Sequence, residues 1–146
     1  MTEVAATVRG RLVVQTGNRC GYCQAHQHYV YEPLHIEHIF PRSQGGSSDE
    51  RNLWLACSLC NRYKSDQTHA REPVTGRRVH LFNPRRQQWQ RHFRWSVEGT
   101  EIVGQTVCGR ATVVALQLNN DRAILVRQHW IQAGWHPPSR SRRGQP

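Results

Sequence analysis

Residues 20–23 of this 146-residue chain read Cys-Gly-Tyr-Cys, and residues 57–60 read Cys-Ser-Leu-Cys. Two such C-x2-C pairs supply the four soft thiolates that close a tetrahedral zinc site with no open position. We therefore expect one structural Zn²⁺ held by Cys20, Cys23, Cys57 and Cys60. It would fasten the start of the chain to a helix that begins at the second pair. Redox pairs or buried thiols are the alternatives, and Cys108, which has no partner, is expected to be a small buried residue.

The charge of the chain indicates an anionic partner. Lys and Arg number 20 against 10 Asp and Glu, for a formal net charge of +10. Lys64 is the only lysine, so nearly all of the positive charge is arginine, whose planar fork suits phosphate oxygens. A four-thiolate zinc site subtracts little from this excess. Composition alone fits a nucleic-acid partner and a soluble protein from an arginine-rich proteome equally well.

Hydropathy and the N-terminal residues indicate the cellular compartment in which the protein is expected. No run approaches the ~18 apolar residues that a membrane helix needs. The apolar stretch at residues 4–8 is short and is followed by Arg9 and Arg11, so it does not resemble a secretory signal. We expect a cytoplasmic protein with no membrane partner, in which five cysteines are poor candidates for disulfides. The oligomeric state is left open.

Periodicity and turn signals predict a mixed set of short elements. In the first half we expect a helix over 3–16, strands over 34–40 and 53–56, and a helical turn from 57 to about 66. A break is expected at 71–76. In the second half we expect a hairpin with strands at 93–96 and 101–103, and two helices capped by Thr106 and Asn120.

Arginines alternate with aromatic residues in the second half. The set comprises Arg77, Arg78, Arg85, Arg86, Arg91 and Arg94 together with Phe82, Trp89, Phe93 and Trp95. Such a mixture can track a nucleic-acid backbone and stack on bases. It is equally typical of a hydrophobic core bordered by charged residues. The sequence leaves these two interpretations open.

The residues between and after the cysteine pairs form a composite motif. They are Glu37-His38-Ile39-Phe40-Pro41, then Gly45-Gly46, then Asn52-Leu53, and finally Asn61 and Lys64. This pattern resembles the HNH nuclease family, whose signature is similar to (D/E)-H-I-x-P, a GG loop, N-L and C-x-x-C-N-x-x-K. The three positions that name the family fall on His38, Asn52 and Asn61. The resemblance covers residues from about 9 to 68, and the interleaved cysteines are similar to the zinc-bearing branch.

The resemblance implies a ββα-metal fold and assigns roles to the motif residues. His38 would be the general base, since an imidazole titrates near neutrality. Glu37 and Asn61 would be oxygen ligands of one Mg²⁺ or Mn²⁺ ion that polarises the scissile phosphate. Asn52 would bridge backbone groups of the loop and hold the strand of His38 in register. Family precedent implies products with a 5′-phosphate and a 3′-hydroxyl.

Three basic residues lie close to the motif. Arg42, Arg62 and Lys64 are expected to contact nucleic-acid phosphates, and a solvated charged face is the alternative. The family more often has Asp at position 37 and His at position 61, so the preferred metal is open. Neighbouring residues of a strand point to opposite faces, yet Glu37 and His38 must reach one phosphate. We therefore expect a twist or bulge near the end of that strand.

Together these features predict a mixed α/β (α+β) protein. A ββα-metal HNH module with its zinc site is expected over residues 1–72, a small C-terminal α/β lobe of unknown role over 73–137, and a disordered basic tail over 138–146. The expected function is metal-dependent hydrolysis of phosphodiester bonds in DNA, with RNA as a further possible substrate. A zinc-dependent nucleic-acid-binding protein with little or no cleavage is the main alternative, and a structural zinc domain for protein contacts is the third.

Overall fold

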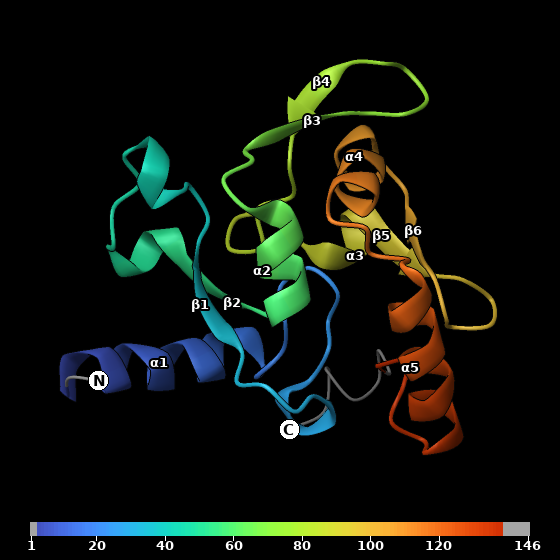
Figure 1. Cartoon of the computed structure of the whole chain (residues 1–146), viewed down its shortest axis with the longest axis horizontal. Coiled ribbons are helices and arrows are strands. Elements are labelled where there is room, and N and C mark those ends of the chain that lie inside the picture. The colour runs from blue at the N-terminus through green and yellow to red at the C-terminus, as the bar shows by residue number, and fades with distance from the viewer. Residues whose placement is uncertain (1–2, 139–146) are drawn as a thin grey trace.

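The computed structural model describes residues 3–138, with side chains from residue 7 onward, so the expected tail lies almost wholly outside the described residues. The first half runs from α1 to α2, blue to green in Figure 1. Its elements are α1 (Glu3–Thr16), η1 (Gln27–Tyr29), β1 (His35–His38), η2 (Arg42–Gln44), η3 (Glu50–Asn52), β2 (Leu53–Ala56) and α2 (Ser58–Lys64). The helix and the two strands predicted here are confirmed, with shorter strand bounds for β1.

The β1–β2 hairpin and α2 form a ββα unit. β1 pairs antiparallel with β2, from His35 opposite Ala56 to His38 opposite Leu53. Helix α1 packs on β2 and α2 packs on β1, with Leu12 of α1 in one apolar cluster with Leu53. The unit is the mixed α/β arrangement that the sequence predicted. It fixes the strand end that carries His38.

Up to residue 138, the second half contains two small hairpins and three helices. Its elements are β3 (His69–Arg71), β4 (Arg78–His80), α3 (Trp89–His92), β5 (Phe93–Trp95), β6 (Ile102–Gly104), α4 (Val107–Ala115) and α5 (Asp121–Gln132). The predicted β5–β6 hairpin is confirmed, and so are the caps: Thr106 accepts from the Gly109 N–H, and Asn120 accepts from the Ala123 N–H.

The stretch at 71–76 is a tight turn between two paired strands. β3 and β4 pair antiparallel on either side of it. The carboxylate of Glu72, which is fully buried, accepts hydrogen bonds from the backbone N–H groups of Val74 and Thr75. Two three-residue strands are too short for a recognisable alternation in the sequence. The expected break is therefore the turn of the β3–β4 hairpin.

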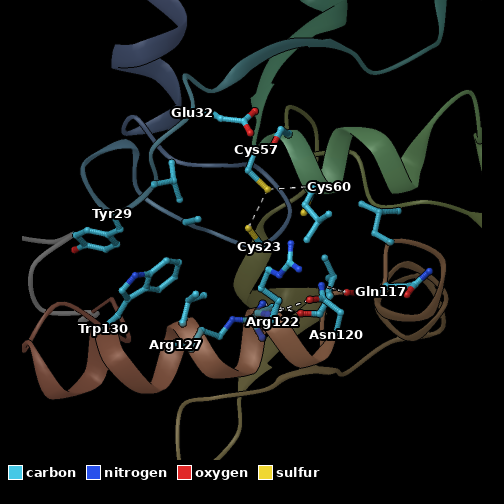
Figure 2. A pocket seen from close by; sticks show the side chains of 18 of the residues that line it. Cys23, Tyr29, Glu32, Cys57, Cys60, Gln117, Asn120, Arg122, Arg127 and Trp130 are labelled. Carbon is cyan, nitrogen blue, oxygen red and sulfur yellow. Dashed lines mark hydrogen bonds between the residues drawn. The ribbon is translucent and has the colours of Figure 1, made fainter.

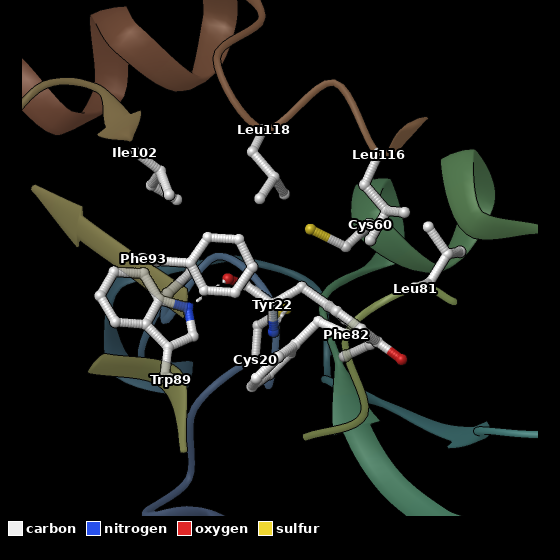
Figure 3. Packing of buried hydrophobic residues seen from close by; sticks show 12 residues of the cluster. Cys20, Tyr22, Cys60, Leu81, Phe82, Trp89, Phe93, Ile102, Leu116 and Leu118 are labelled. Atoms are coloured by element: carbon white, nitrogen blue, oxygen red, sulfur yellow. Dashed lines mark hydrogen bonds between the residues drawn. The ribbon is translucent and has the colours of Figure 1, made fainter. Parts of the chain in front are cut away.

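One hydrophobic core crosses both halves. Figure 3 shows Tyr22 and the zinc-site residues Cys20 and Cys60 packed among residues of the second half. The second half contributes Leu81, Phe82, Trp89, Phe93, Ile102, Leu116 and Leu118, all buried. The indole of Trp89 also donates to the Tyr22 carbonyl at 2.8 Å. Phe82, Trp89 and Phe93 are therefore core residues, which settles the open choice for these aromatics against base stacking.

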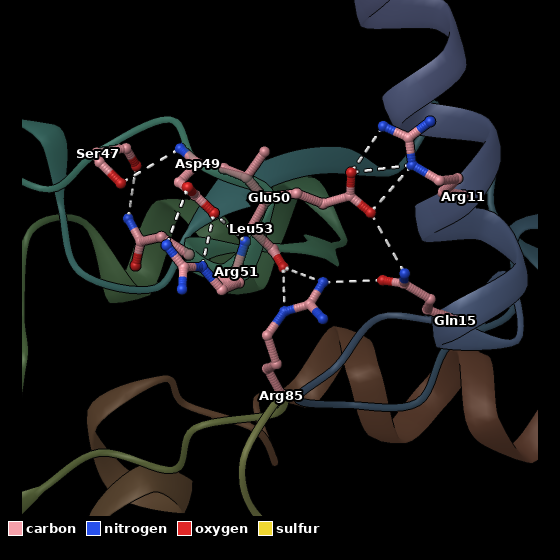
Figure 4. A network of polar contacts seen from close by, with 9 residues as sticks. Arg11, Gln15, Ser47, Asp49, Glu50, Arg51, Leu53 and Arg85 are labelled. Carbon is pink, nitrogen blue, oxygen red and sulfur yellow. Dashed lines mark hydrogen bonds and ion pairs between the residues drawn. The ribbon is translucent and has the colours of Figure 1, made fainter.

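Arg85 joins the two halves through polar contacts. Its guanidinium donates to the Leu53 carbonyl from Nε at 3.2 Å and from Nη2 at 3.1 Å, and to Gln15 at 2.8 Å (Figure 4). The same group lies 4.9 Å from the ring centroid of Trp54. Arg85, one of the arginines considered for a nucleic-acid surface, therefore holds the second half against α1 and β2.

Candidate active site and zinc centre

The four predicted zinc ligands lie at one point of the fold. The Sγ atoms of Cys20, Cys23, Cys57 and Cys60 are all within 4.8 Å of one another, and none of these cysteines forms a disulfide. Cys23 Sγ and Cys57 Sγ are 3.7 Å apart (Figure 2). Zn–S bonds of about 2.3 Å in a tetrahedron place sulfur atoms about 3.8 Å apart. The donor set and its spacing therefore fit the predicted structural zinc.

Backbone hydrogen bonds orient the thiol groups of Cys57 and Cys20. Cys57 is the N-cap of α2 and accepts from the Cys60 N–H at 3.4 Å, and Cys20 accepts from the Tyr22 N–H at 3.4 Å. Burial raises the pKa of the Cys20 thiol, whereas hydrogen bonds from Cys20 and Cys23 lower the pKa of the Cys57 thiol. A bound cation would stabilise all of the thiolates at once, and it would couple folding to metal binding.

Glu37 points into the protein from β1. Its side chain is 3% exposed. Its Oε1 lies 2.7 Å from Lys64 Nζ, and its Oε2 accepts from the Tyr22 hydroxyl at 2.8 Å. Burial raises the pKa of this carboxyl, and the neighbouring ammonium opposes the shift. The pair links α2 to β1, and Tyr22 links both to the first cysteine pair.

Lys64 differs from its expected place on a phosphate-binding surface. It is 2% exposed, and besides Glu37 its ammonium contacts the Ile39 carbonyl at 3.0 Å. The helix register that places Cys60 in the zinc cluster turns Lys64 toward β1. In this structure Lys64 is the partner of a buried carboxylate, and a phosphate would have to displace that contact to reach it.

His38 lies at the end of β1 and is partly exposed. Its Nε2 lies 3.1 Å from Ser48 Oγ. Partial burial lowers the pKa of His38, and the nearby charges of Arg42 and Lys64 lower it further. A lowered pKa keeps the imidazole neutral near pH 7, and the neutral ring is the form that accepts a proton.

The strand that carries Glu37 and His38 is regular. Its pairing with β2 is uninterrupted, and the Ile39 N–H continues the ladder by donating to the Asn52 carbonyl at 2.9 Å. Of the two expected distortions, a twist or a bulge, the bulge is wrong, and the twist stays a prediction. Alternation along the strand directs Glu37 toward Lys64 and Tyr22, and His38 toward Ser48. Within residues 3–138 these two side chains share no hydrogen-bond partner.

Asn52 makes the loop bridge that the sequence predicted. Its Nδ2 donates to the carbonyls of Phe40 at 2.9 Å and Ser47 at 2.8 Å, and its Oδ1 accepts from the Phe40 N–H at 2.8 Å. Gly46 lies so close to the Phe40 carbonyl that a Cβ there would overlap it. The side chain of Asn52 and the missing side chain of Gly46 thus set the shape of the loop that follows His38.

We expect Asn52→Ala to destabilise the protein by about 1–3 kcal/mol, because three hydrogen bonds and the backbone groups they satisfy are lost. Any activity that depends on His38 should fall roughly 10–100-fold as the loop loses its geometry. Thermal unfolding and a cleavage assay measure the two effects. Ser43→Ala is the matched control, because this exposed serine lies on the same loop and its side chain makes no hydrogen bond within the described chain. Unchanged stability and activity in Asn52→Ala would contradict the bridging role.

The remaining predicted residues lie on or beside α2. Asn61 follows Cys60 directly and is partly exposed, and its side-chain amide has no hydrogen-bond partner among the described residues. Arg62 on α2 and Arg42 on η2 are both exposed. The zinc cluster, by fixing the start of α2, also fixes the position of Asn61. Arg42 and Arg62 remain accessible to an anionic partner.

A cavity of about 340 Å³ lies elsewhere, between α2 and α5. Figure 2 shows Cys23, Cys57 and Trp130 at its wall. Neither Glu37, His38 nor Asn61 lines it. A site for a polymer lies on a surface and does not need an enclosed volume, so we place the candidate active site at the end of β1.

Two contacts of the site were missing from the sequence interpretation. Tyr22, which donates to Glu37, lies inside the first cysteine pair, so a folded zinc knuckle could have pointed to it as a buried neighbour. Ser48, beside His38, lies in the polar loop at 43–52, and no sequence pattern distinguishes it from the serines next to it. Both contacts depend on how the loop and the knuckle fold back onto β1.

Comparison with known proteins identifies the class of this segment. Residues 20–67 match the model of the HNH endonuclease family. The matched segment contains the four-cysteine cluster, so this part of the chain is an HNH module of the zinc-bearing type. HNH modules are nuclease-type domains that act on nucleic acids, and they bind metal. No curated protein and no solved structure matches the chain. Within the described part, no helix is long and apolar enough to span a membrane.

Proposed function

We propose that this protein is a metal-dependent endonuclease that hydrolyses phosphodiester bonds in DNA. The observation that carries the proposal is the placement of His38. It is a partly exposed imidazole with a lowered pKa, at the end of a strand whose following loop is fixed by Asn52. The net charge of +10 supports a polyanionic substrate.

In the proposed reaction His38 accepts the proton of the attacking water. In the tautomer that this role requires, Nε2–H donates to Ser48 Oγ and orients the ring, and Nδ1 keeps the lone pair that accepts the proton. Arg42 and Arg62 hold the phosphates that flank the scissile bond, from exposed positions on η2 and α2. Asn52 keeps the backbone of the loop in place while the strand end contacts the substrate.

One feature of the buried carboxylate supports a catalytic cation. Glu37 Oε1 is buried and already lies 2.7 Å from one cation, the Lys64 ammonium. An oxygen in this state suits a cation, and the Asn61 amide has no hydrogen-bond partner within the described chain. Glu37 and Asn61 would hold one Mg²⁺ or Mn²⁺, which supplies charge stabilisation at the scissile phosphate and the leaving 3′ oxygen. Lys64 would have to move from Oε1 when the ion binds.

The same contact favours a second candidate function. Lys64 already neutralises Glu37, so a chain that keeps this pair closed would bind nucleic acid without cutting it. The two functions share the zinc site, the basic charge and the HNH fold. They differ only in the response to divalent ions.

We expect the purified zinc-loaded protein to nick supercoiled plasmid in millimolar Mg²⁺ or Mn²⁺. Brief treatment with EDTA should abolish nicking, and added Mg²⁺ should restore it while the zinc content stays constant. Gel mobility of the plasmid and elemental analysis of the protein provide the two readouts. Tight DNA binding without nicking under any divalent ion would reject the nuclease and leave the binding protein.

A further inference from the structure

The β3–β4 hairpin has one face made only of basic side chains. Residues opposite each other across the hairpin are His69 and His80, and Arg71 and Arg78. Side chains alternate along a strand, so these four lie on the same face. Between them Ala70 and Val79 take the other face, where both strands pack against α4.

This face holds like charges without a counter-charge. Arg71 and Arg78, both exposed, lie directly opposite each other, an arrangement that destabilises an isolated hairpin. Neither has an ion-pair partner within residues 3–138. The nearest carboxylate in sequence, Glu72, is fully buried and engaged by the turn and by Arg110. An external anion would relieve the repulsion.

The two histidines add to the same imbalance. Their ring centroids are 3.8 Å apart. The pKa of His69 is lowered by desolvation first, and then by His80 and Arg78. The lowered pKa favours the neutral form of His69 in the free protein, and a bound anion would favour its charged form.

The hairpin is connected to the loop of the candidate active site. Gln44 on that loop donates to the Asp66 carbonyl at 2.6 Å, just before β3 begins. The hairpin base is closed by the Leu81 N–H, which donates to the Thr68 carbonyl at 3.0 Å. Figure 1 places the hairpin at the edge of the molecule opposite to the end of α5. The Gln44–Asp66 hydrogen bond thus joins the loop of the candidate active site to the segment that leads into the hairpin.

We propose that the face formed by His69, Arg71, Arg78 and His80 is a second contact for duplex DNA, which binds its phosphates outside the HNH module. The proposal rests on the nuclease or binding function above, because it names how the same substrate is held. A two-stranded ribbon fits the roughly 12 Å wide major groove of B-form DNA, where it meets the flanking phosphates. The deep, narrow major groove of duplex RNA does not admit it.

The test compares two double variants in a His38→Ala background, so that binding is measured without cutting. Arg71→Gln with Arg78→Gln removes the hairpin charge. Arg94→Gln with Arg122→Gln removes the same charge from exposed positions on β5 and α5. Affinity for a short DNA duplex is measured across a salt series. Each lost phosphate contact lowers the slope of log K against log salt by about 0.9.

We expect the hairpin variant to lose roughly tenfold or more in affinity at low salt, and about 2 in slope, while the control changes little. Arg71 also donates to the Gly76 carbonyl, so the thermal melt of each variant is recorded. Arg78→Glu serves as a second variant, because its side chain makes no hydrogen bond within the described chain. Equal losses in both double variants, no loss in either, or a loss seen only with single-stranded DNA or duplex RNA would overturn the proposal.

The outcomes separate the two proposals. A hairpin-dependent duplex affinity in a protein that never nicks DNA would leave the hairpin contact standing and reject the nuclease. Nicking by the wild-type protein together with unchanged binding by Arg71→Gln/Arg78→Gln would do the reverse.

Discussion

Replacing His38 with alanine is expected to lower the rate of plasmid nicking by roughly 10²–10⁴-fold, the usual contribution of a general base. The variant should remain folded, because the side chain is partly exposed and its one hydrogen bond within the described chain is to Ser48. Its affinity for DNA should match that of the wild type, since a general base adds little to ground-state binding. Single-turnover cleavage and equilibrium binding measure the two quantities. Nicking at the wild-type rate by a preparation free of contaminating nuclease would remove His38 from the mechanism.

The metal-ligand variants provide the contrast for that result. Asn61→Ala removes a partly exposed amide that has no partner among the described residues, so its effect should be confined to the ion. Glu37→Gln is expected to affect stability as well as metal binding, because it leaves the Lys64 ammonium buried beside a neutral group. Its thermal melt must therefore accompany its kinetics. Excess Mn²⁺ should partly restore Asn61→Ala and leave His38→Ala inactive.

Loss of the zinc site is expected to be the largest effect on stability. Cys57→Ser should lose the zinc and several kcal/mol of folding free energy, a large part of the 5–15 kcal/mol typical of a domain. The substitution is specific, because serine is a good N-cap and keeps that role at the start of α2. Cys20 and Cys60 belong to the core shared by both halves, so the whole chain should unfold at a lower temperature.

Cys108→Ser is the matched control for the zinc variant. Cys108 packs against the core but lies outside the four-cysteine cluster, so its replacement should leave the zinc content unchanged and cost little stability. Elemental analysis should give one zinc per chain for the wild type and the control. A cooperative melt that chelator does not shift, in a protein that contains no zinc, would contradict the structural role.

The predictions that were confirmed depended on local sequence signals or on motifs with a characteristic spacing. The cysteine pairs and the caps at Thr106 and Asn120 each rest on a few residues whose chemistry is independent of the rest of the chain, and the Asn52 bridge followed from the family resemblance. The errors concerned contacts between distant segments. The bulge in β1 was invoked to bring Glu37 and His38 together, but the ladder with β2 is continuous. Lys64 was expected at the surface, but it pairs with Glu37.

The sequence by itself indicated the class of residues 20–67, because the spacing of two cysteine pairs around a Glu-His, Asn and Asn motif resembles a known family. Only the tertiary structure decided which charged side chains are accessible to a substrate. Burial is a property of packing: α2 turns Lys64 inward onto Glu37, Arg85 is held against β2, and the β3–β4 turn leaves Arg71 and Arg78 exposed side by side. A count of arginines cannot separate these cases, since each depends on segments brought together by the shared core.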